Sequence, residues 1–364
     1  MARGRKPSLV TLTQAVAAAV VLARLARGRT QRPPLTADCV PAPPGPVSVV
    51  IPARDEAARI GPCLAGLADD PDVHEVIVVD DRSADATAAV AAAGGARVLT
   101  GAELPRGWVG KPWALQQGLE AAGGEYVVTL DADTRPRPGL IRALIAELDS
   151  GADIVTGGVR FVCDTPGERW LHPSLLVTLV YRFGPIGVQV PARPQRVLMN
   201  GQCVAVRREP LLAAGGFRAA AAYMTDDVAL GRALVSSGWR LSFVDAGDLI
   251  STRMHASTRE LWREWGRSIA MTDVTTPAWQ AADLAVVWLT LGLPPVRLAL
   301  RRSTRLDKLL IAVRWAMVAP LGRAYTRRDV PFWLSPLADP LAALRLTWSA
   351  LHPSRTWRGR TYDT

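Results

Sequence analysis

The sequence predicts an α/β protein built on a doubly wound, mostly parallel sheet. Three short apolar runs support this fold class, each rich in β-branched residues and each followed at once by polar or acidic residues: 47–52, 76–79 and 126–130. Such nearly continuous runs are typical of strands buried on both faces of a parallel sheet. Helix-like stretches separate them, and repeated strand–helix units of this size favour a doubly wound arrangement.

The remaining segments are expected to continue this alternation. In chain order we predict helices at 57–67 and 84–93, a strand at 96–99, a loop leading into a helix over 107–118, a helix at 138–148 and a strand at 154–161. These are followed by a strand entered by a turn over 199–206, helices at 208–214 and 228–236, and a strand at 239–244. The Thr and Asp residues at the start of 228–236 are expected to cap that helix. Residues 170–191 are apolar but show no clear period, so we expect a less regular segment there.

The formal net charge of +10 is unevenly distributed. Residues 1–46 carry +6 and residues 294–364 carry +9, which leaves −5 for the middle of the chain. A nucleic-acid binder is expected to place its basic residues on the folded core. Basic ends that flank apolar segments fit an anionic membrane surface better. The charge pattern therefore predicts a membrane as partner and disfavours a nucleic acid.

The N-terminus reads as an apolar anchor over residues 1–31. Its uncharged stretch, 8–23, is slightly shorter than a usual transmembrane helix and has basic residues on both sides. The basic segment after it argues against a cleaved signal peptide, so we expect a short or tilted anchor, with an in-plane helix as the alternative. Basic residues are more numerous after the stretch, which favours a cytoplasmic catalytic domain at the cell membrane. Residues 32–46, rich in proline, read as a stiff linker.

Two further regions follow this linker: a catalytic domain over 47–275 and a helical region over 276–364. In the helical region, apolar segments at 285–296, 309–321 and 330–351 are interrupted by Pro, Arg or Asp. None is an uncharged run long enough for a standard span. We expect amphipathic or re-entrant helices at the membrane face, with core helices of a soluble domain as the alternative.

Acidic residues are expected to gather at one edge of the sheet. Ligands of open α/β sheets bind outside the carboxyl ends of the strands, and Asp131 and Asp133 follow the strand at 126–130 directly. Carboxylate oxygens are ligands for hard divalent cations, so this pair predicts a site for Mg²⁺ or Mn²⁺. A turn capped by Asp side chains is the alternative.

Four segments, in this order along the chain, resemble glycosyltransferase family 2: 47–56, 78–87, 131–133 and 225–230. The resemblance covers about residues 47–270 and implies a GT-A fold and a nucleotide-sugar donor. The segments 107–114, 262–268, 333–339 and 357–362 resemble, more specifically, the hopanoid-associated and carotenoid glycosyltransferase branch. That likeness implies a lipid or isoprenoid acceptor. The Gln-x-x-Arg-Trp motif of processive members is absent, which disfavours a polysaccharide synthase.

The resemblance also implies roles for individual residues. Asp227 matches the general base that deprotonates the acceptor, with Asp226 beside it as the competitor, and a helix terminus next to Asp227 is expected to keep it ionised. One base together with a metal implies inversion. We expect the donor to be bound by Pro52, Ala53, Arg54, Glu56, Asp80, Asp81, Lys111, Asp131, Arg263 and Arg267. We expect the acceptor to be bound by Asn200, Gly201 and Trp265.

The leading interpretation is a membrane-associated, inverting glycosyltransferase that moves a sugar, most simply from a UDP-sugar, to a hydroxyl or carboxyl of a lipid-type acceptor. A sugar nucleotidyltransferase is one alternative, but no glycine-rich phosphate loop follows the first strand. A dinucleotide dehydrogenase fails for the same reason. A membrane scaffold that has lost catalysis is the non-enzymatic alternative, and the intact acids Asp131, Asp133 and Asp227 argue against it.

Overall fold

The computed structural model describes residues 9–190, 193–353, 356–357 and 360–361. The chain divides into two compact units that interleave in sequence. The sheet unit comprises residues 32–162, 186–254 and 355–364, and the helical unit comprises residues 1–31, 163–185 and 255–354.

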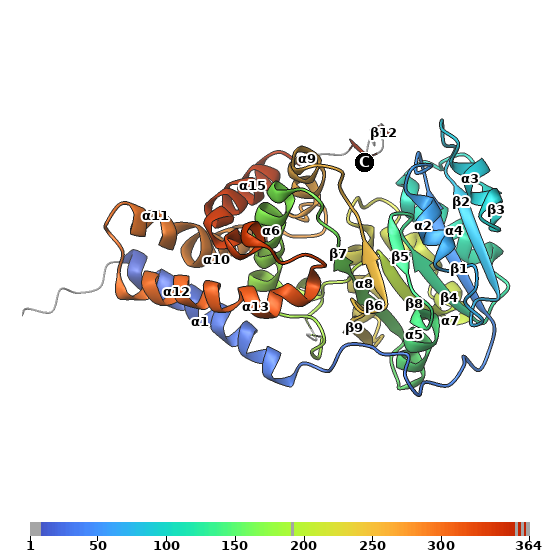
Figure 1. Cartoon of the computed structure of the whole chain (residues 1–364), viewed down its shortest axis with the longest axis horizontal. Helices are drawn as coiled ribbons and strands as arrows, with labels where there is room; N and C mark the ends of the chain where they lie inside the picture. Colours follow the sequence, from blue (N-terminus) through green and yellow to red (C-terminus); the bar gives the residue numbers. More distant parts are fainter. Residues whose placement is uncertain (1–8, 191–192, 354–355, 358–359, 362–364) are drawn as a thin grey trace, which may run out of the picture. The chain divides into compact units, whose positions relative to one another are not determined.

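A seven-stranded sheet forms the centre of the sheet unit, in the order β3-β2-β1-β4-β8-β6-β9 (Figure 1). Its strands are β1 (Val47–Ala53), β2 (Glu75–Asp80), β3 (Arg97–Thr100), β4 (Tyr126–Leu130), β6 (Ile154–Gly158), β8 (Cys203–Arg207) and β9 (Leu241–Asp245). Neighbouring strands are parallel except that β8 runs antiparallel to both β4 and β6. This mostly parallel sheet confirms the predicted fold class.

Helices cover both faces of this sheet, which explains the continuous apolar runs. The helices of this unit are α2 (Ile60–Ala65), α3 (Thr87–Ala93), α4 (Gly110–Ala121), α5 (Leu140–Asp149), α7 (Arg208–Ala213) and α8 (Asp226–Ser236). Val49 and Ile51 of β1 belong to a buried cluster with apolar residues of α2 and α5. Val50 points to the other face, where a Cβ on Gly118 of α4 would lie 2.3 Å from its Cγ1. Burying each such Val or Ile side chain stabilises the fold by roughly 1.5–3 kcal/mol.

Several boundaries differ from the sequence-based prediction for local reasons. Helix α2 begins at Ile60 because Asp55 has a left-handed backbone, with φ 53°, and the chain turns before the helix. Helix α3 begins at Thr87 because the carboxylate of Asp85 accepts a hydrogen bond from the Thr87 N–H, 3.0 Å away, in a turn. Thr225 precedes α8 without making the predicted side-chain cap.

The predicted strand at 154–161 is in fact two strands in different sheets. Its second part is β7 (Arg160–Phe161), which joins β5 (Thr134–Pro136) and β10 (Ile250–Thr252) in a small sheet of order β5-β10-β7. The segment 199–206 forms a strand entered by a turn, as predicted, with the turn at residues 201–202 and β8 beginning at Cys203. A two-stranded hairpin of β11 (Thr356–Trp357) and β12 (Arg360–Thr361) lies near the end of the chain.

The helical unit is built from α1 (Leu9–Ala26), α6 (Pro166–Phe183), α9 (Thr258–Ser268), α10 (Pro277–Val287), α11 (Leu293–Ala299), α12 (Arg305–Ala316), α13 (Val318–Leu321), α14 (Val330–Trp333) and α15 (Asp339–Leu351). Helix α6 corrects the expectation of a less regular segment at 170–191. It starts with a capping box between Thr165 and Glu168. It is buried around most of its circumference, so its sequence lacks an amphipathic period.

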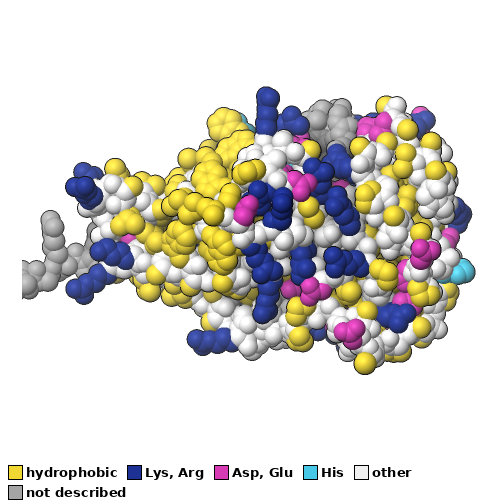
Figure 2. Space-filling model, in the orientation of Figure 1, with side chains coloured by type: hydrophobic (Ala, Val, Ile, Leu, Met, Phe, Trp, Pro, Cys, Tyr) yellow, Lys and Arg dark blue, Asp and Glu magenta, His cyan; other side chains and the backbone are white. Residues whose placement is uncertain are grey.

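Two helices of this unit are long and apolar enough to cross a membrane, Leu9–Thr30 with mean hydropathy 1.9 and Pro277–Ala299 with 1.3. The apolar segment predicted at 285–296 thus belongs to a longer helix, which also contains the charged residues Asp283 and Arg297. A π-helical turn, Trp288–Gly292, joins α10 to α11 and makes the helix continuous. Figure 2 shows hydrophobic side chains gathered over the region labelled α10 and α15 in Figure 1.

Candidate functional site

The strand order brings the predicted site residues of the sheet unit to one edge. Because β1, β2 and β4 are parallel, the residues after their carboxyl ends lie on the same side of the sheet. Strand β8 is antiparallel to β4, so the turn before it, with Asn200 and Gly201, arrives at this same edge. The N–H of Asp131 donates to the carbonyl of Gln202 at 3.1 Å and joins the two segments.

Lys111 lies at the centre of a group of carboxylates. Its Nζ is 2.6 Å from Oδ1 of Asp131, and it projects from the first turn of α4. Burial alone would lower the pKa of Lys111. The carboxylates of Asp131 and then of Asp226 and Asp227 outweigh burial and hold this pKa well above its ordinary value. Lys111 is therefore a fixed positive charge beside the predicted metal ligands and the predicted general base.

Asp227 is held by two backbone N–H groups. Its Oδ2 accepts from Gly201 at 2.9 Å, and its Oδ1 accepts from Val228 at 2.8 Å. Asn200 fixes this turn, since its side-chain amide donates to the carbonyl of Gly157 at 2.9 Å. The orientation of the Asp227 carboxylate thus depends on the turn before β8.

The pKa of Asp227 is shifted in the direction opposite to the one that a helix terminus favours. Burial raises the pKa of Asp227, and this effect exceeds the lowering by Lys111 and by the two backbone N–H groups. Burial also raises the pKa of Asp226 to about 7. The charge of Lys111 lowers this pKa, and the charge of Asp227 adds to the rise. Desolvation therefore outweighs the helix terminus at this position.

The environment of Asp131 and Asp133 favours a bound cation at this pair. Burial raises the pKa of Asp133 to about 7, and the charges of Asp131 and Glu56 add to this rise. A divalent cation would relieve that repulsion. Within the described residues no group of three or more His, Cys, Asp or Glu side chains is arranged to hold a metal. Mg²⁺ is commonly bound by one or two carboxylates plus substrate phosphates, so the pair fits a cation that arrives with a diphosphate.

A second acidic group lies at the ends of β1 and β2. Ala53 pairs with Asp80 in the sheet register and follows Pro52, and the carbonyl of Ala53 accepts from the N–H of Asp81 at 2.8 Å. The guanidinium of Arg54 donates to the Asp81 carbonyl at 2.6 Å. Oδ1 of Asp80 is buried and has no hydrogen-bond partner among the described residues.

Two arginines that sequence reasoning did not assign contact these acids. Arg59 lies three residues after Glu56 and contacts its Oε2 at 3.0 Å, a spacing that would have identified it. Arg360 contacts both carboxylate oxygens of Asp81. It belongs to the segment 357–362 that the family resemblance singled out without a role.

Three predicted site residues lie in the other unit, on α9. Arg263 is exposed and pairs with Glu264 at 2.8 Å. Trp265 stacks on His172 with ring centroids 4.2 Å apart. The side chain of Arg267 lies outside the described part of the structure.

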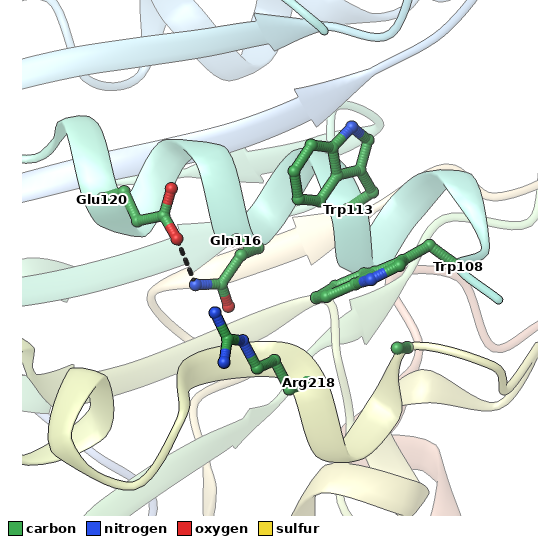
Figure 3. Close-up of a pocket in the computed structure, with 6 residues that line it drawn as sticks. Trp108, Trp113, Gln116, Glu120 and Arg218 are labelled. Atoms are coloured by element: carbon green, nitrogen blue, oxygen red, sulfur yellow. Dashed lines mark hydrogen bonds between the residues drawn. The ribbon is translucent and has the colours of Figure 1, made fainter. Parts of the chain in front are cut away.

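A cavity of about 400 Å³ lies beside α4, and the side chains of α4 that line it do not include Lys111. Figure 3 shows Trp108 and Trp113 on one side and Arg218 on the other, with a hydrogen bond of 2.6 Å from Gln116 to Glu120. The two indole rings meet edge to face at 5.1 Å. The cavity is bordered by the loop that leads to Lys111 and by the segment before Asp226. Its lining comprises Trp108, Trp113, Gln116, Glu120, Arg218 and Ala221.

Comparisons with known proteins show similarity to glycosyltransferases in sequence and in fold. Residues 48–213 match the sequence model of glycosyl transferase family 2. An uncharacterized glycosyltransferase of Mycobacterium tuberculosis is 37% identical over 134 residues, 37% of this chain and 56% of that protein. The 4,4'-diaponeurosporenoate glycosyltransferase of Staphylococcus aureus is 27% identical over 253 residues, 67% of this chain and 65% of that protein. The matches therefore span a little over half of the mycobacterial relative and just under two thirds of the staphylococcal one.

A solved structure with a similar fold is the mannosyltransferase PcManGT of Pyrobaculum calidifontis, determined in complex with GDP-Man and Mn²⁺. Its TM-score is 0.50 at 20% identity, over 92% of this chain and 99% of that chain. At this identity the similarity concerns the fold.

Proposed function

Because this chain belongs to glycosyltransferase family 2 through residues 48–213 and has the GT-A fold, we propose that it is a metal-dependent, inverting enzyme. In this proposal the donor is a nucleoside-diphosphate sugar, a UDP-sugar in the simplest case. The acceptor is a hydroxyl or carboxyl of a lipid or isoprenoid at the membrane. The observation that carries the proposal is the cluster of Lys111, Asp131, Asp226 and Asp227 at the carboxyl edge of the sheet.

The chemistry follows from what each group can do. The acceptor hydroxyl gives its proton to the carboxylate of Asp227 as its oxygen attacks the anomeric carbon. The bond from that carbon to the diphosphate breaks, and attack from the opposite face inverts the configuration. Lys111 supplies a positive charge next to the leaving group. A divalent cation held by Asp131 and Asp133 would neutralise further diphosphate charge.

The nucleoside side of the donor is assigned to the acids at the end of β2. Asp80 has a buried carboxylate oxygen without a hydrogen-bond partner among the described residues, as expected of a group that accepts from a ligand. Pro52, Ala53, Arg54 and Glu56 border this position at the end of β1. We assign Asn200 and Gly201, next to Asp227, to the acceptor side. Arg263, Arg267 and Trp265 remain proposed contacts from α9.

The acceptor class rests on the surface of the helical unit. Large hydrophobic side chains that are strongly exposed lie on its helices, among them Leu9 at 80%, Val330 at 69% and Leu351 at 69%. Figure 2 shows hydrophobic side chains gathered on the surface of this unit, and an exposed apolar patch marks a membrane or protein contact. The similarity to an enzyme named for a carotenoid acid, 4,4'-diaponeurosporenoate, supports a lipid-type acceptor.

This proposal assigns parts of the chain as follows: an anchor at 1–31, a linker at 32–46, the catalytic domain at 47–275 and a membrane-associated helical region at 276–364. The helix Leu9–Thr30 would anchor the chain, with the catalytic domain on the cytoplasmic side because more basic residues follow the apolar stretch than precede it.

The direct test incubates membranes that contain the protein with a panel of nucleotide sugars, followed by lipid extraction and mass analysis. The expected result is a lipid whose mass increases by one sugar residue, only when the donor and a divalent cation are both present. Membranes with an Asp227→Asn variant are the matched control. If no donor in the panel modifies any lipid, while purified protein hydrolyses none of them, the proposed activity is wrong.

A further inference from the structure

The end of the chain contacts the proposed nucleoside side of the donor site. Strand β12 begins with Arg360, whose Nη1 lies 3.2 Å from Oδ1 and 3.1 Å from Oδ2 of Asp81. The two residues are 279 positions apart in the sequence, and both belong to the sheet unit. The hairpin of β11 and β12 supplies this arginine from a part of the chain that follows every helix.

The Asp81 carboxylate is buried, and only 5% of its side chain is exposed. Arg54 approaches it from the neighbouring strand end at 3.6 Å. A buried carboxylate is costly unless it is paired, and removal of its partner leaves an uncompensated charge. The ion pair with Arg360 therefore holds the Asp81 side chain in place more strongly than an exposed ion pair of this unit holds its two side chains.

Asp81 is adjacent to the residue that faces the proposed ligand. Asp80, whose Oδ1 has no hydrogen-bond partner among the described residues, is the last residue of β2, and Asp81, which pairs with Arg360, follows it directly. The N–H of Ser83 donates to Oδ2 of Asp80 at 3.4 Å, which leaves Oδ1 for a donor from outside the protein. A shift of the Asp81 backbone moves Asp80 as well, because the two residues share a peptide bond.

We propose that Arg360 is a positioning residue of the donor site. Through Asp81 it holds the end of β2 in place, so that Asp80 accepts a hydrogen bond from the nucleoside of the donor. Binding of a nucleoside diphosphate then depends on the C-terminal hairpin. This inference rests on the proposed function, since it assumes a nucleoside-diphosphate donor at this edge.

The test measures UDP binding by calorimetry, with GDP in parallel, on the full-length protein in detergent with Mg²⁺. Four variants are compared with the wild type: Arg360→Ala, Arg360→Lys, Asp81→Asn and the double variant Asp81→Asn/Arg360→Ala. The matched control is Arg240→Ala, which removes an exposed arginine paired with Asp153 at 3.2 Å. That pair lies at the amino ends of β6 and β9, where the register joins Ile154 to Leu241.

We expect Arg360→Ala to weaken UDP binding about 10-fold or more, the scale of one charged hydrogen-bond contact. Arg360→Lys should recover part of the loss, because a lysine preserves the charge but not the guanidinium geometry. The double variant should bind as weakly as Asp81→Asn alone, because Arg360 acts only through Asp81. Arg240→Ala should bind like the wild type.

Equal UDP affinity of Arg360→Ala and the wild type, with only a lower unfolding temperature, would mean that the contact is structural and the inference wrong. Additive losses in the double variant would also overturn it, since Arg360 would then contact the nucleotide directly. If the wild-type protein binds neither UDP nor GDP, the proposed function itself fails. That outcome differs visibly from a variant-specific loss.

Discussion

The replacement of Gly201 by alanine adds one methyl group at the most crowded point of the proposed site. The new Cβ would lie 3.0 Å from Cβ of Asp227, 3.3 Å from its Oδ2 and 3.3 Å from Nζ of Lys111. The first of these contacts requires the neighbouring atoms to move by a few tenths of an ångström. The N–H of Gly201 also donates to Asp227 at 2.9 Å and so positions its carboxylate. An alanine at this position would push the same carboxylate away.

The expected cost has two parts. Overpacking by one methylene-sized group destabilises a well-packed interior by about 1–3 kcal/mol. A displaced general base loses its alignment with the acceptor hydroxyl, and a misplacement of about 1 Å lowers a rate up to about 10²-fold. For shifts of a few tenths of an ångström we expect kcat to fall about 10-fold. UDP affinity should stay within about 2-fold, because the nucleoside side of the site lies at the end of β2.

The assay measures turnover with the lipid acceptor and UDP binding by calorimetry on the same protein preparation. Gly61→Ala is the matched control, since a Cβ on Gly61 has no atom within 4 Å and the residue lies inside α2. Alanine there should leave turnover unchanged and raise helix stability by about 0.5–1 kcal/mol. If Gly201→Ala turns over like the wild type while Asp227→Asn does not, the placement of the base beside this turn is incorrect.

Three further changes test other parts of the proposal. Asp227→Asn should retain UDP binding and lose transfer by at least about 10²-fold, with a smaller loss for Asp226→Asn; a larger loss for Asp226→Asn would reassign the base. Asp131→Ala and Asp133→Ala should each abolish transfer in a folded protein, as judged by circular dichroism, and full activity in excess chelator would exclude a metal role. Removal of residues 1–30 should weaken, without eliminating, sedimentation with membranes, because exposed apolar residues remain on the other helices; an intact chain that stays in the supernatant at low salt without detergent would contradict membrane association.

Local sequence determined the sheet and one side of the site. Strands such as β1 and β4 are buried on both faces, so their residues must be apolar throughout, and the run of β-branched residues is visible without a structure. The polar residues that follow are equally visible, because each strand must end where the chain leaves the core. Asp80, Asp131 and Asp133 could therefore be placed at one edge from the strand pattern and its order alone.

Other features depended on packing between segments far apart in the chain. Helix α6 is buried on nearly every side, so it lacks the period by which an amphipathic helix is recognised. The contact of Arg360 with Asp81 joins residues 279 positions apart, and no local pattern encodes such a pairing. The Gly201 turn meets Asp227 only because β8 runs antiparallel to β4.

The pKa shifts of the acids were also decided by tertiary structure. A helix terminus is a local feature that sequence reveals, and it favours an ionised Asp227. Burial depends on which other segments cover the group, and here it raises the pKa of Asp227 in spite of that terminus and of Lys111. Residue type and spacing therefore determined which groups are present, whereas the direction of their pKa shifts follows from desolvation, a property of the assembled fold.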